Sequence, residues 1–406
     1  MKCGLLGEKL GHSYSPRIHA ELADYEYRLY EKSPAELDAF LREGGWDGLN
    51  VTIPYKKTVL PYCTALSERA KRIGAVNTLV RLPDGGIYGE NTDAYGFEKL
   101  VGRAGIEAAG RKCLVFGSGG ASVMACAVLR DLGAGSVTVV SRHGEDNYGN
   151  LDRHADAELL VNTTPLGMYP NTGAAPAPLS LFPACEAVLD VVYNPARTEL
   201  ILQAEKRGLR CASGLYMLVA QAKRSAELFT GREIPDAEIE RIETLLRREM
   251  LNIVLVGMPG CGKSSVADVL GRMLGRPVVE ADALIAAAAG CTIPEIFARE
   301  GETGFRERET AVLREQGKRS GIILSTGGGC VTREENYDLL HQNGTIVWLQ
   351  RDTALLPKDG RPISQRSDLK ELYEKRRPRY ERFADLVIEN SGSVRETAEK
   401  VREALG

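Results

Sequence analysis

The stretch GMPGCGKSS, residues 257–265, decides the fold of the second half of the chain. It fulfils the pattern G-x-x-x-x-G-K-[ST], and it lies between the strand-like run NIVLVG and the helix-like run VADVLGRML. Small residues let backbone N–H groups surround phosphate oxygens, while Lys263 reaches the β- and γ-phosphates and Ser264 offers a hydroxyl to Mg²⁺. We therefore predict a P-loop that binds ATP. Its predicted contacts are Gly260, Cys261, Gly262, Lys263, Ser264 and Ser265.

A second glycine-rich turn, VFGSGGAS, occupies residues 115–122 and also follows a strand-like run and precedes a helix-like one. Gly117 and Gly119 fit the first two positions of the dinucleotide pattern G-x-G-x-x-G, while Ser122 stands at the third. Because the match is incomplete, the turn alone is weak evidence. Its place between a strand and a helix favours a Rossmann dinucleotide site.

The next predicted strand, SVTVV, indicates which dinucleotide binds. It ends in Ser141 and Arg142, where an NAD site carries an acidic residue for the ribose hydroxyl. A serine and an arginine suit a 2′-phosphate instead, and the prediction is therefore NADP(H). The alternative is that Arg142 is a surface charge, because Glu145 and Asp146 follow closely.

Bulk properties exclude several classes of protein. The chain has 406 residues, enough for about two to three domains, and a net charge of −3, which gives no general attraction to nucleic acid or to anionic membranes. No apolar run approaches the roughly 20 residues of a transmembrane helix. Nine cysteines occur without a C-x-x-C pair, which favours reduced thiols over a metal site. We expect a cytoplasmic protein and leave its oligomeric state open.

Strand-like and helix-like runs alternate along the chain, which is typical of the α/β class. GLNVTIPY, AVNTLVRL and GIYGENTD read as strands or strand ends, and residues 167–183 read as a loop. A strongly helical run ends near Met250, and a new strand begins at once. No glycine- or serine-rich linker separates them, which predicts a stiff join between residues 1–249 and 250–406.

The residues around the P-loop suggest the molecule that receives the phosphoryl group. Glu280 and Asp282 follow the second strand of this half, where carboxylates can hold Mg²⁺ or orient a hydroxyl. Arg306 lies in GFRERE, three glycines follow the strand IILST, and Arg361 lies in GRPI. Each arginine alone could be a solvated charge. Together they predict a pocket for a small anionic polyol.

This set of motifs, with KRRPRY near the end, resembles the shikimate kinase family over residues 251–406. The resemblance implies that Arg306 binds the shikimate carboxylate and that Asp282 binds its hydroxyls. It also implies a metal site at Ser264 and Glu280, although family members usually carry aspartate where this chain has Glu280. The remaining residues that it implies are Gly328 in the pocket, Arg376 as a second carboxylate-binding arginine and Arg361 as a lid arginine.

In the first half, candidate acid–base and substrate residues are spread over several short motifs. NVTIPYKK supplies Lys56 and Lys57, and GENTD supplies Asp93. A lysine beside a carboxylate stays charged and can give a proton to a developing alkoxide. Spacing does not show that they meet, and both could form surface salt bridges. Ser13 and Ser15 could bind a carboxylate or cap a helix.

These motifs, with GAVNT, GSGGA, VVYNP and GLYMLVAQA, resemble the shikimate dehydrogenase family over about residues 1–248. The resemblance implies a substrate-binding part at about 1–93 and 212–249, and a Rossmann part at about 94–211. Lys56 would pair with Asp93 as the catalytic groups. The implied substrate contacts are Ser13, Ser15, Thr52, Asn77, Tyr193 and Gln221. The implied cofactor contacts are Gly117, Gly119, Gly120, Ala121, Ser141, Arg142, Gly214 and Met217.

Both resemblances together predict a bifunctional enzyme. The first half would reduce 3-dehydroshikimate to shikimate with NADPH, and the second would phosphorylate shikimate with ATP and Mg²⁺. The expected fold is a substrate-binding α/β domain, a Rossmann domain and a P-loop kinase domain with a parallel sheet. Two alternatives stay open: an enzyme for quinate or with NAD preference, and a sensor without catalytic activity. A sensor would have lost Lys56, Asp93 or Lys263, which are all present.

Overall fold

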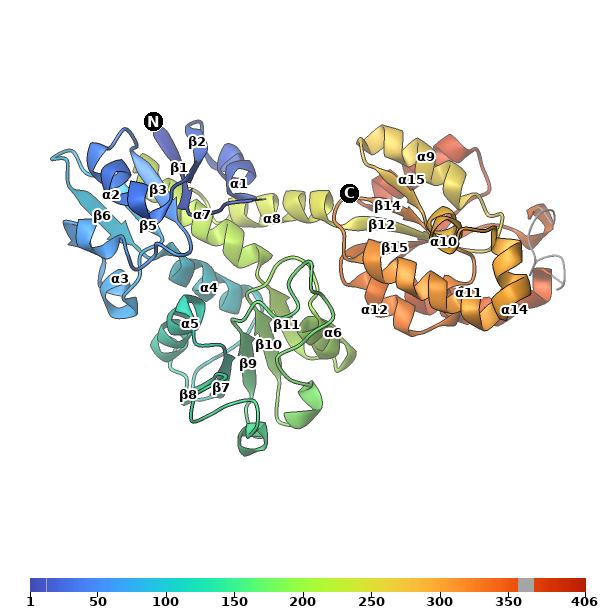
Figure 1. The fold of residues 1–406 in the computed structure, drawn as a ribbon, viewed down its shortest axis with the longest axis horizontal. Helices are drawn as coiled ribbons and strands as arrows, with labels where there is room; N and C mark the ends of the chain where they lie inside the picture. Colours follow the sequence, from blue (N-terminus) through green and yellow to red (C-terminus); the bar gives the residue numbers. More distant parts are fainter. Residues whose placement is uncertain (12, 357–368) are drawn as a thin grey trace. The chain divides into compact units, whose positions relative to one another are not determined.

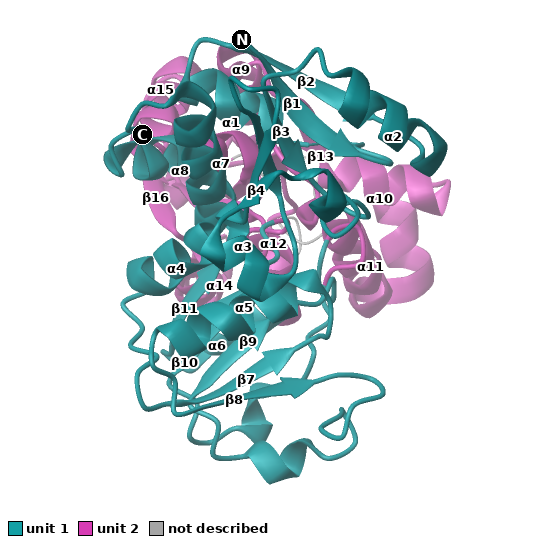
Figure 2. Cartoon of the chain, turned by 90° about the vertical axis from the view of Figure 1, so that its left-hand side faces the viewer, with its two compact units in different colours: residues 1–168, 173–193, 198–245 teal, residues 169–172, 194–197, 246–406 magenta. Residues whose placement is uncertain are grey.

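The computed structural model describes residues 1–11, 13–356 and 369–406. The chain divides into two compact units, shown in teal and magenta in Figure 2. Unit 1 comprises residues 1–168, 173–193 and 198–245, and unit 2 comprises residues 169–172, 194–197 and 246–406. Unit 1 contains two sheets and unit 2 contains one.

The first sheet of unit 1 is mixed. Its order is β2-β1-β3-β5-β6-β4, and β5 runs antiparallel to both of its neighbours. Buried side chains of this sheet and of the segments that pack on it, mostly aliphatic but including Trp46, form a hydrophobic core. The strands are β1 (Lys2–Gly7), β2 (Glu26–Glu31), β3 (Gly48–Val51), β4 (Ala65–Leu66), β5 (Thr78–Arg81) and β6 (Ile87–Glu90).

Short capped helices accompany this sheet. α1 starts with proline in its first turn, where the missing N–H costs nothing. α2 begins with a capping box between Ser33 and Glu36, and the Ser67 hydroxyl accepts from a backbone N–H at the start of α3. The helices are α1 (Ser15–Leu22), α2 (Pro34–Glu43) and α3 (Glu68–Ile73).

The second sheet of unit 1 is fully parallel, with the order β11-β10-β9-β7-β8. The chain moves from β7 to β8 on one side and returns with β9 on the other side. This arrangement creates a topological switch point at the carboxyl ends of β7 and β9, where open α/β sheets bind ligands. Its elements are β7 (Lys112–Phe116), α5 (Gly120–Asp131), β8 (Ser136–Val140), β9 (Leu159–Asn162), β10 (Ala187–Asp190), α6 (Glu199–Lys206) and β11 (Arg210–Ser213).

Two helices, α4 (Thr92–Arg103) and α7 (Leu215–Thr230), pack on each other and connect these sheets (Figure 1). Gly96 permits the approach, because a Cβ atom there would lie 2.6 Å from the Met217 carbonyl oxygen. α4 begins directly after β6, so the run GENTD, predicted as a strand end, contains a strand end and a helix start.

Unit 2 is built on a parallel sheet of order β13-β14-β12-β15-β16, which confirms the predicted parallel kinase sheet. Its core combines residues of the strands with aliphatic and aromatic residues of the helices, among them Tyr380 and Phe383 of α14. Its strands are β12 (Asn252–Val256), β13 (Val278–Glu280), β14 (Ile323–Ser325), β15 (Gly344–Gln350) and β16 (Leu386–Glu389). Its helices are α9 (Lys263–Leu274), α10 (Ala281–Ala289), α11 (Ile293–Gly317), α12 (Glu335–His341), α14 (Leu369–Phe383) and α15 (Val394–Ala404).

α8 (Ala237–Met250) crosses the division between the units, and Leu251 alone separates it from β12. The predicted direct passage from helix to strand is therefore present. α11 is kinked at Gly301, whose φ of 69° interrupts the helix. Among the described residues, no single helix is long and apolar enough to cross a membrane; α10 and α11 have the required length and apolar composition only as a pair, which is bent by 91°.

Candidate active sites

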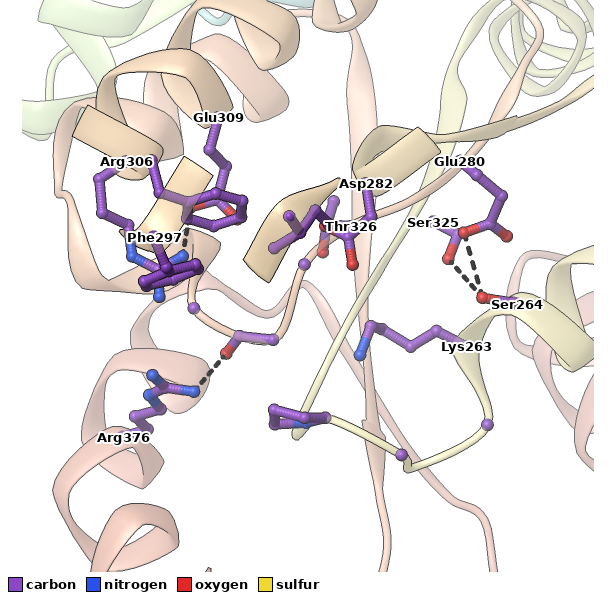
Figure 3. A pocket seen from close by; sticks show the side chains of 18 of the residues that line it. Lys263, Ser264, Glu280, Asp282, Phe297, Arg306, Glu309, Ser325, Thr326 and Arg376 are labelled. Carbon is purple, nitrogen blue, oxygen red and sulfur yellow. Dashed lines mark hydrogen bonds and ion pairs between the residues drawn. The ribbon is translucent and has the colours of Figure 1, made fainter. Parts of the chain in front are cut away.

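The P-loop of unit 2 borders a cavity of about 440 Å³, shown in Figure 3. The loop connects β12 to α9, and Gly262 begins that helix with a φ of 99°, which only glycine adopts without strain. Lys263 is buried, and its ammonium donates to the carbonyl oxygens of Gly257 at 2.9 Å and Met258 at 3.1 Å. The helix N-terminus and this ammonium together suit a polyphosphate.

The carboxylate of Glu280 lies on the P-loop side of the cavity (Figure 3). Its Oε2 accepts from the Ser264 hydroxyl at 3.1 Å, while its Oε1 is buried without a hydrogen-bond partner. Burial raises the pKa of Glu280. Among the described residues no group of three or more His, Cys, Asp or Glu side chains could hold a metal ion. A hydroxyl and an unsatisfied carboxylate oxygen nevertheless fit Mg²⁺, which takes its other ligands from phosphates and water.

On the opposite side of the cavity, Arg306 is held by two glutamates of the same helix. Its Nη1 donates to Glu309 at 2.6 Å and its Nη2 to Glu302 at 3.3 Å. Arg306 and Glu309 are both buried, and burial raises the pKa of Glu309 although the arginine opposes this. The Nε of Arg306 has no hydrogen-bond partner. A buried guanidinium with spare donor capacity is suited to a carboxylate ligand.

Each of the three glycines after β14 lies against a different neighbouring group. The distance from a hypothetical Cβ atom on each glycine to that group shows how close the neighbour is. At Gly327 it would be 2.5 Å from a Glu309 oxygen and 3.0 Å from Asp282 Oδ1. At Gly328 it would be 2.5 Å from the Pro259 side chain of the P-loop, and at Gly329 2.0 Å from Arg306 Nη2. Three glycines in a row are therefore required by their neighbours.

Five of the six kinase residues with a predicted catalytic or substrate-binding role line this one cavity: Lys263, Asp282, Arg306, Gly328 and Arg376. Figure 3 also shows the buried Arg376 donating to the Gly328 carbonyl oxygen, at 3.1 Å. The sixth, Arg361, lies outside the described residues.

Sequence reasoning missed several residues at this site. Glu309 reads as one more charge in GFRERE, and only its burial distinguishes it. Phe297 and Phe305 stack at 4.6 Å between ring centroids and line the cavity. Asn390 donates to the Cys261 carbonyl oxygen at 2.5 Å and so holds the P-loop from a segment 129 residues away. No local motif marks these residues.

In unit 1, Lys56 and Asp93 form an ion pair, with 2.6 Å between Nζ and Oδ2. Their side chains are 32% and 20% exposed, so they are accessible to a small molecule yet partly shielded from water. Asp93 lies in the first turn of α4, where the helix dipole favours a negative charge. Lys57 points to solvent, and the paired lysine is thus Lys56.

The other predicted substrate residues come from separate elements of unit 1. Ser15 begins α1 and is nearly buried, and its N–H donates to the Ser13 hydroxyl at 3.2 Å. Asn77 is buried directly before β5. The remaining three are Thr52 after β3, Tyr193 after β10 and Gln221 on α7. Tyr193 packs edge-on against Tyr14, with 6.2 Å between the ring centroids.

The glycine turn after β7 is open to a ligand. Gly117 has a φ of 109°, and its added Cβ atom would lie 2.8 Å from the Thr163 hydroxyl after β9. Gly119 and Gly120, at the start of α5, would meet nothing within 4 Å. Ala121 follows in the same first turn. Backbone N–H groups at a helix start, beside the switch point of the sheet, suit a pyrophosphate.

The residues after β8 bear on the choice of dinucleotide. Arg142 is exposed, and no hydrogen bond or salt bridge holds its guanidinium within the part of the chain that the structure describes. Asp146 binds His154 Nε2 at 2.7 Å, and its backbone oxygen accepts from Ser141 N–H. Asp146, one of the two acidic residues that weaken the prediction of a 2′-phosphate site, therefore has another partner. Glu145, the other one, is exposed.

A buried carboxyl group, Asp190, organises the loops beyond β9 and β10. It accepts from the Thr198 hydroxyl at 2.7 Å, from Val192 N–H at 3.0 Å and from Asn162 Nδ2 at 3.0 Å. Burial raises its pKa to about 6. The loop that it holds after β10 contacts Gly214, whose N–H donates to the Val192 carbonyl oxygen at 3.0 Å and where a Cβ atom would lie 2.1 Å from the Val191 carbonyl oxygen. Met217 follows on α7.

Comparisons with known proteins agree with this division. A family model for the shikimate dehydrogenase substrate binding domain matches residues 5–79, and one for shikimate kinase matches residues 259–406. The chain is 38% identical over 260 residues to shikimate dehydrogenase (NADP(+)) of Clostridium perfringens, an alignment that covers 59% of this chain and 96% of that protein.

Solved structures resemble the first part of the chain as well. Shikimate 5-dehydrogenase from Thermus thermophilus, in complex with NADP(H) and shikimate, is 31% identical with a TM-score of 0.55, covering 60% of this chain and 98% of the other. Quinate dehydrogenase from Corynebacterium glutamicum, in complex with NAD, is 29% identical with a TM-score of 0.55, covering 61% and 99%.

Proposed function

The chain belongs to the shikimate dehydrogenase family and carries a shikimate kinase domain, and we propose that it reduces 3-dehydroshikimate with NADPH and phosphorylates the resulting shikimate with ATP. It is a bifunctional enzyme of the shikimate pathway. We assign one reaction to each unit because each unit contains its own set of candidate catalytic groups. Unit 1 has the Lys56–Asp93 pair, and unit 2 has a P-loop facing a buried arginine.

In the dehydrogenase reaction, bound NADPH supplies the hydride. Lys56 holds a proton at Nζ, and the Asp93 carboxylate keeps that ammonium charged and oriented, so that it protonates the carbonyl oxygen as it becomes an alkoxide. Ser13 and Ser15 bind the substrate carboxylate through their hydroxyls. Further polar contacts to the substrate come from Thr52, Asn77, Tyr193 and Gln221.

In the kinase reaction, Arg306 and Arg376 bind the shikimate carboxylate, and Asp282 orients the attacking hydroxyl. Lys263 compensates negative charge on the transferred phosphoryl group. Ser264 and Glu280 would hold the Mg²⁺ ion, which neutralises phosphate charge when bound. Arg361 completes this proposal as a lid arginine.

We assign the dehydrogenase to residues 1–249 and the kinase to 250–406. The first sheet and the helices α7 and α8 make the substrate-binding part, and the second sheet makes the Rossmann part. The predicted boundary at residue 211 falls inside β11, which pairs with β10 as far as Ser213, and we place it after that residue. All nine cysteines are free thiols, in keeping with a cytoplasmic location.

The preferred dinucleotide is NADP(H), because Arg142 is exposed and lacks a protein partner in the described structure. Arg142, with Ser141, would bind the 2′-phosphate. The likeness to a quinate dehydrogenase with NAD supports one other candidate, a quinate or NAD enzyme. Steady-state kcat/KM for shikimate and for quinate, each with NADP⁺ and NAD⁺, distinguishes them. The highest value with shikimate and NADP⁺ is expected, and a higher value with quinate or NAD⁺ would refute this choice.

The two-step proposal has its own test. Supplied with 3-dehydroshikimate, NADPH, ATP and Mg²⁺, the intact chain should produce shikimate 3-phosphate. Lys56→Ala should block the first step but still phosphorylate added shikimate, whereas Asp282→Asn should accumulate shikimate. A variant that loses both activities, or neither, would contradict the assignment of the two sites to separate units.

A further inference from the structure

Three hydroxyl groups form a closed triangle in the interior of unit 1. The Oγ atoms of Thr78, Thr92 and Ser225 lie 2.9–3.0 Å from one another. They come from β5, α4 and α7, and all three residues have no exposed surface. Buried hydroxyls that bond to one another across three elements are expensive to assemble, because each must find partners for its proton and its lone pairs.

A side-chain amide and a phenol extend this triangle towards α1. Asn50 Nδ2 donates to Ser225 Oγ at 2.7 Å and to Thr78 Oγ1 at 3.3 Å. Tyr27 donates to Asn50 Oδ1 at 2.8 Å, and burial raises the pKa of its phenol, an effect that a hydrogen bond with Ser15 opposes. The half-buried Tyr27 and the buried Asn50, Thr78, Thr92 and Ser225 thus form one connected network.

One assignment of hydrogens gives each hydroxyl of the triangle a donor and an acceptor role; it places a hydrogen on two of the three sides and leaves the Thr78–Ser225 contact without one. Ser225 donates to the Gln221 carbonyl oxygen at 2.9 Å, so it must accept from its neighbours. Thr92 then donates to Ser225, and Thr78 donates to Thr92. The two amide hydrogens of Asn50 go to Ser225 and Thr78, and every hydroxyl has a donor and an acceptor role. Such a directed chain is sensitive to the loss of any one member.

Each member of the triangle lies close in sequence to a residue to which we assign a role in substrate binding or catalysis. Thr78 follows Asn77, whose Nδ2 donates to Thr92 Oγ1 at 3.0 Å and whose Oδ1 accepts from Thr92 N–H at 2.6 Å. Thr92 precedes Asp93. Ser225 lies one helical turn after Gln221 and binds its carbonyl oxygen. The hydroxyl triangle therefore joins the three elements β5, α4 and α7, which carry or adjoin residues of the proposed dehydrogenase site.

We propose that Ser225 and Thr78 are positioning residues of the dehydrogenase: their hydroxyls set the places of Asn77, Asp93 and Gln221 without touching the substrate. This inference rests on the proposed function of unit 1. A role in stability alone would make a different prediction, because loss of a hydroxyl would then reduce the amount of folded enzyme but leave the affinity of the remaining sites unchanged.

The test measures steady-state kinetics of the intact chain with Ser225→Ala and Thr78→Val, which each remove one hydroxyl. KM for 3-dehydroshikimate should rise about fivefold or more, the effect of one lost hydrogen bond of ordinary strength, while KM for NADPH changes less than about twofold. Thr78→Ser keeps the hydroxyl and should restore most of the affinity. The kinase rate of the same samples, measured under fixed conditions, should stay at the wild-type value, and it serves as the control for the amount of folded chain.

Thr230→Ala is the matched control. Thr230 lies on the same helix, and its hydroxyl makes the same kind of bond, to the Ala226 carbonyl oxygen at 2.8 Å, outside the network. Its KM values should equal those of the wild type. The proposal is overturned if KM for 3-dehydroshikimate is unchanged in both variants, or if both variants lose the folded dehydrogenase unit. A wild-type chain with no dehydrogenase activity would instead refute the proposed function.

Discussion

The substitution Gly329→Ala tests the close fit between the glycine run and the guanidinium of Arg306. Gly329 has a φ of −107°, which alanine adopts without strain, and the backbone alone therefore does not oppose the change. The added methyl group would lie 2.0 Å from Nη2, 2.3 Å from Cζ and 2.4 Å from Nη1 of Arg306. These separations lie far inside van der Waals contact, so the guanidinium must move.

The arginine has little room to yield. It is 7% exposed, it is bound to Glu309 and Glu302, and its Cζ lies 5.2 Å from the centre of the Phe305 ring. Displacement therefore removes at least one charge-assisted hydrogen bond to a bound carboxylate, worth about 1.5–3 kcal/mol. Since about 1.4 kcal/mol corresponds to a factor of ten, kcat/KM for shikimate should fall roughly 10- to 150-fold.

Initial rates of ADP formation at varied shikimate and saturating ATP measure this effect. KM for ATP should change less than about twofold, because the P-loop contacts are separate from Arg306. The dehydrogenase rate of the same sample serves as the internal control for protein amount. A shikimate kcat/KM within about threefold of wild type would refute the reasoning, since it would show that Arg306 moves without cost or does not bind the substrate.

Three further outcomes are expected. Lys56→Ala should lower dehydrogenase kcat by about 10²–10⁴, the usual effect of a lost acid–base group, and a kcat within about threefold of wild type would remove Lys56 from the mechanism. Arg142→Ala should erase most of an NADP⁺ preference of about tenfold or more, measured as the ratio of kcat/KM values with NADP⁺ and NAD⁺; an unchanged ratio contradicts the role of Arg142. Burial raises the pKa of Asp190 from 3.8 to about 6, so the folded state binds more protons there and stability falls as pH rises from about 4 to 6. Asp190→Asn should abolish that part of the pH dependence, on the order of 2–3 kcal/mol, in denaturant unfolding followed at pH 4.5 and 7.5, and the same slope in both proteins would exclude Asp190 as its source.

Local patterns predicted those parts of the sites that depend on consecutive residues. The P-loop, the glycine turn after β7 and the run Gly327–Gly329 each follow a strand, and their positions result from the chain direction in a parallel sheet. Lys56 and Asp93 were predicted from motifs, but their meeting required the fold, because they are 37 residues apart and lie on different elements.

What could not be predicted depends on contacts between distant segments. Glu309 differs from its charged neighbours only in being buried, and burial depends on how α11 packs over the glycines. The hydroxyl triangle joins Thr78 and Thr92 to Ser225 over separations of 147 and 133 residues. The antiparallel place of β5 was likewise missed, because a short strand of alternating residues fits either direction.

The Lys263 ammonium has two carbonyl partners inside its own loop. An incoming phosphate must therefore share or replace these bonds, and the net gain is smaller than that of a new ion pair formed from solvated groups. The same carbonyl oxygens are ready to receive the ammonium again when ADP departs. We therefore expect the loop to keep the lysine desolvated and in place during turnover, which favours rapid exchange of product for fresh ATP over very tight binding.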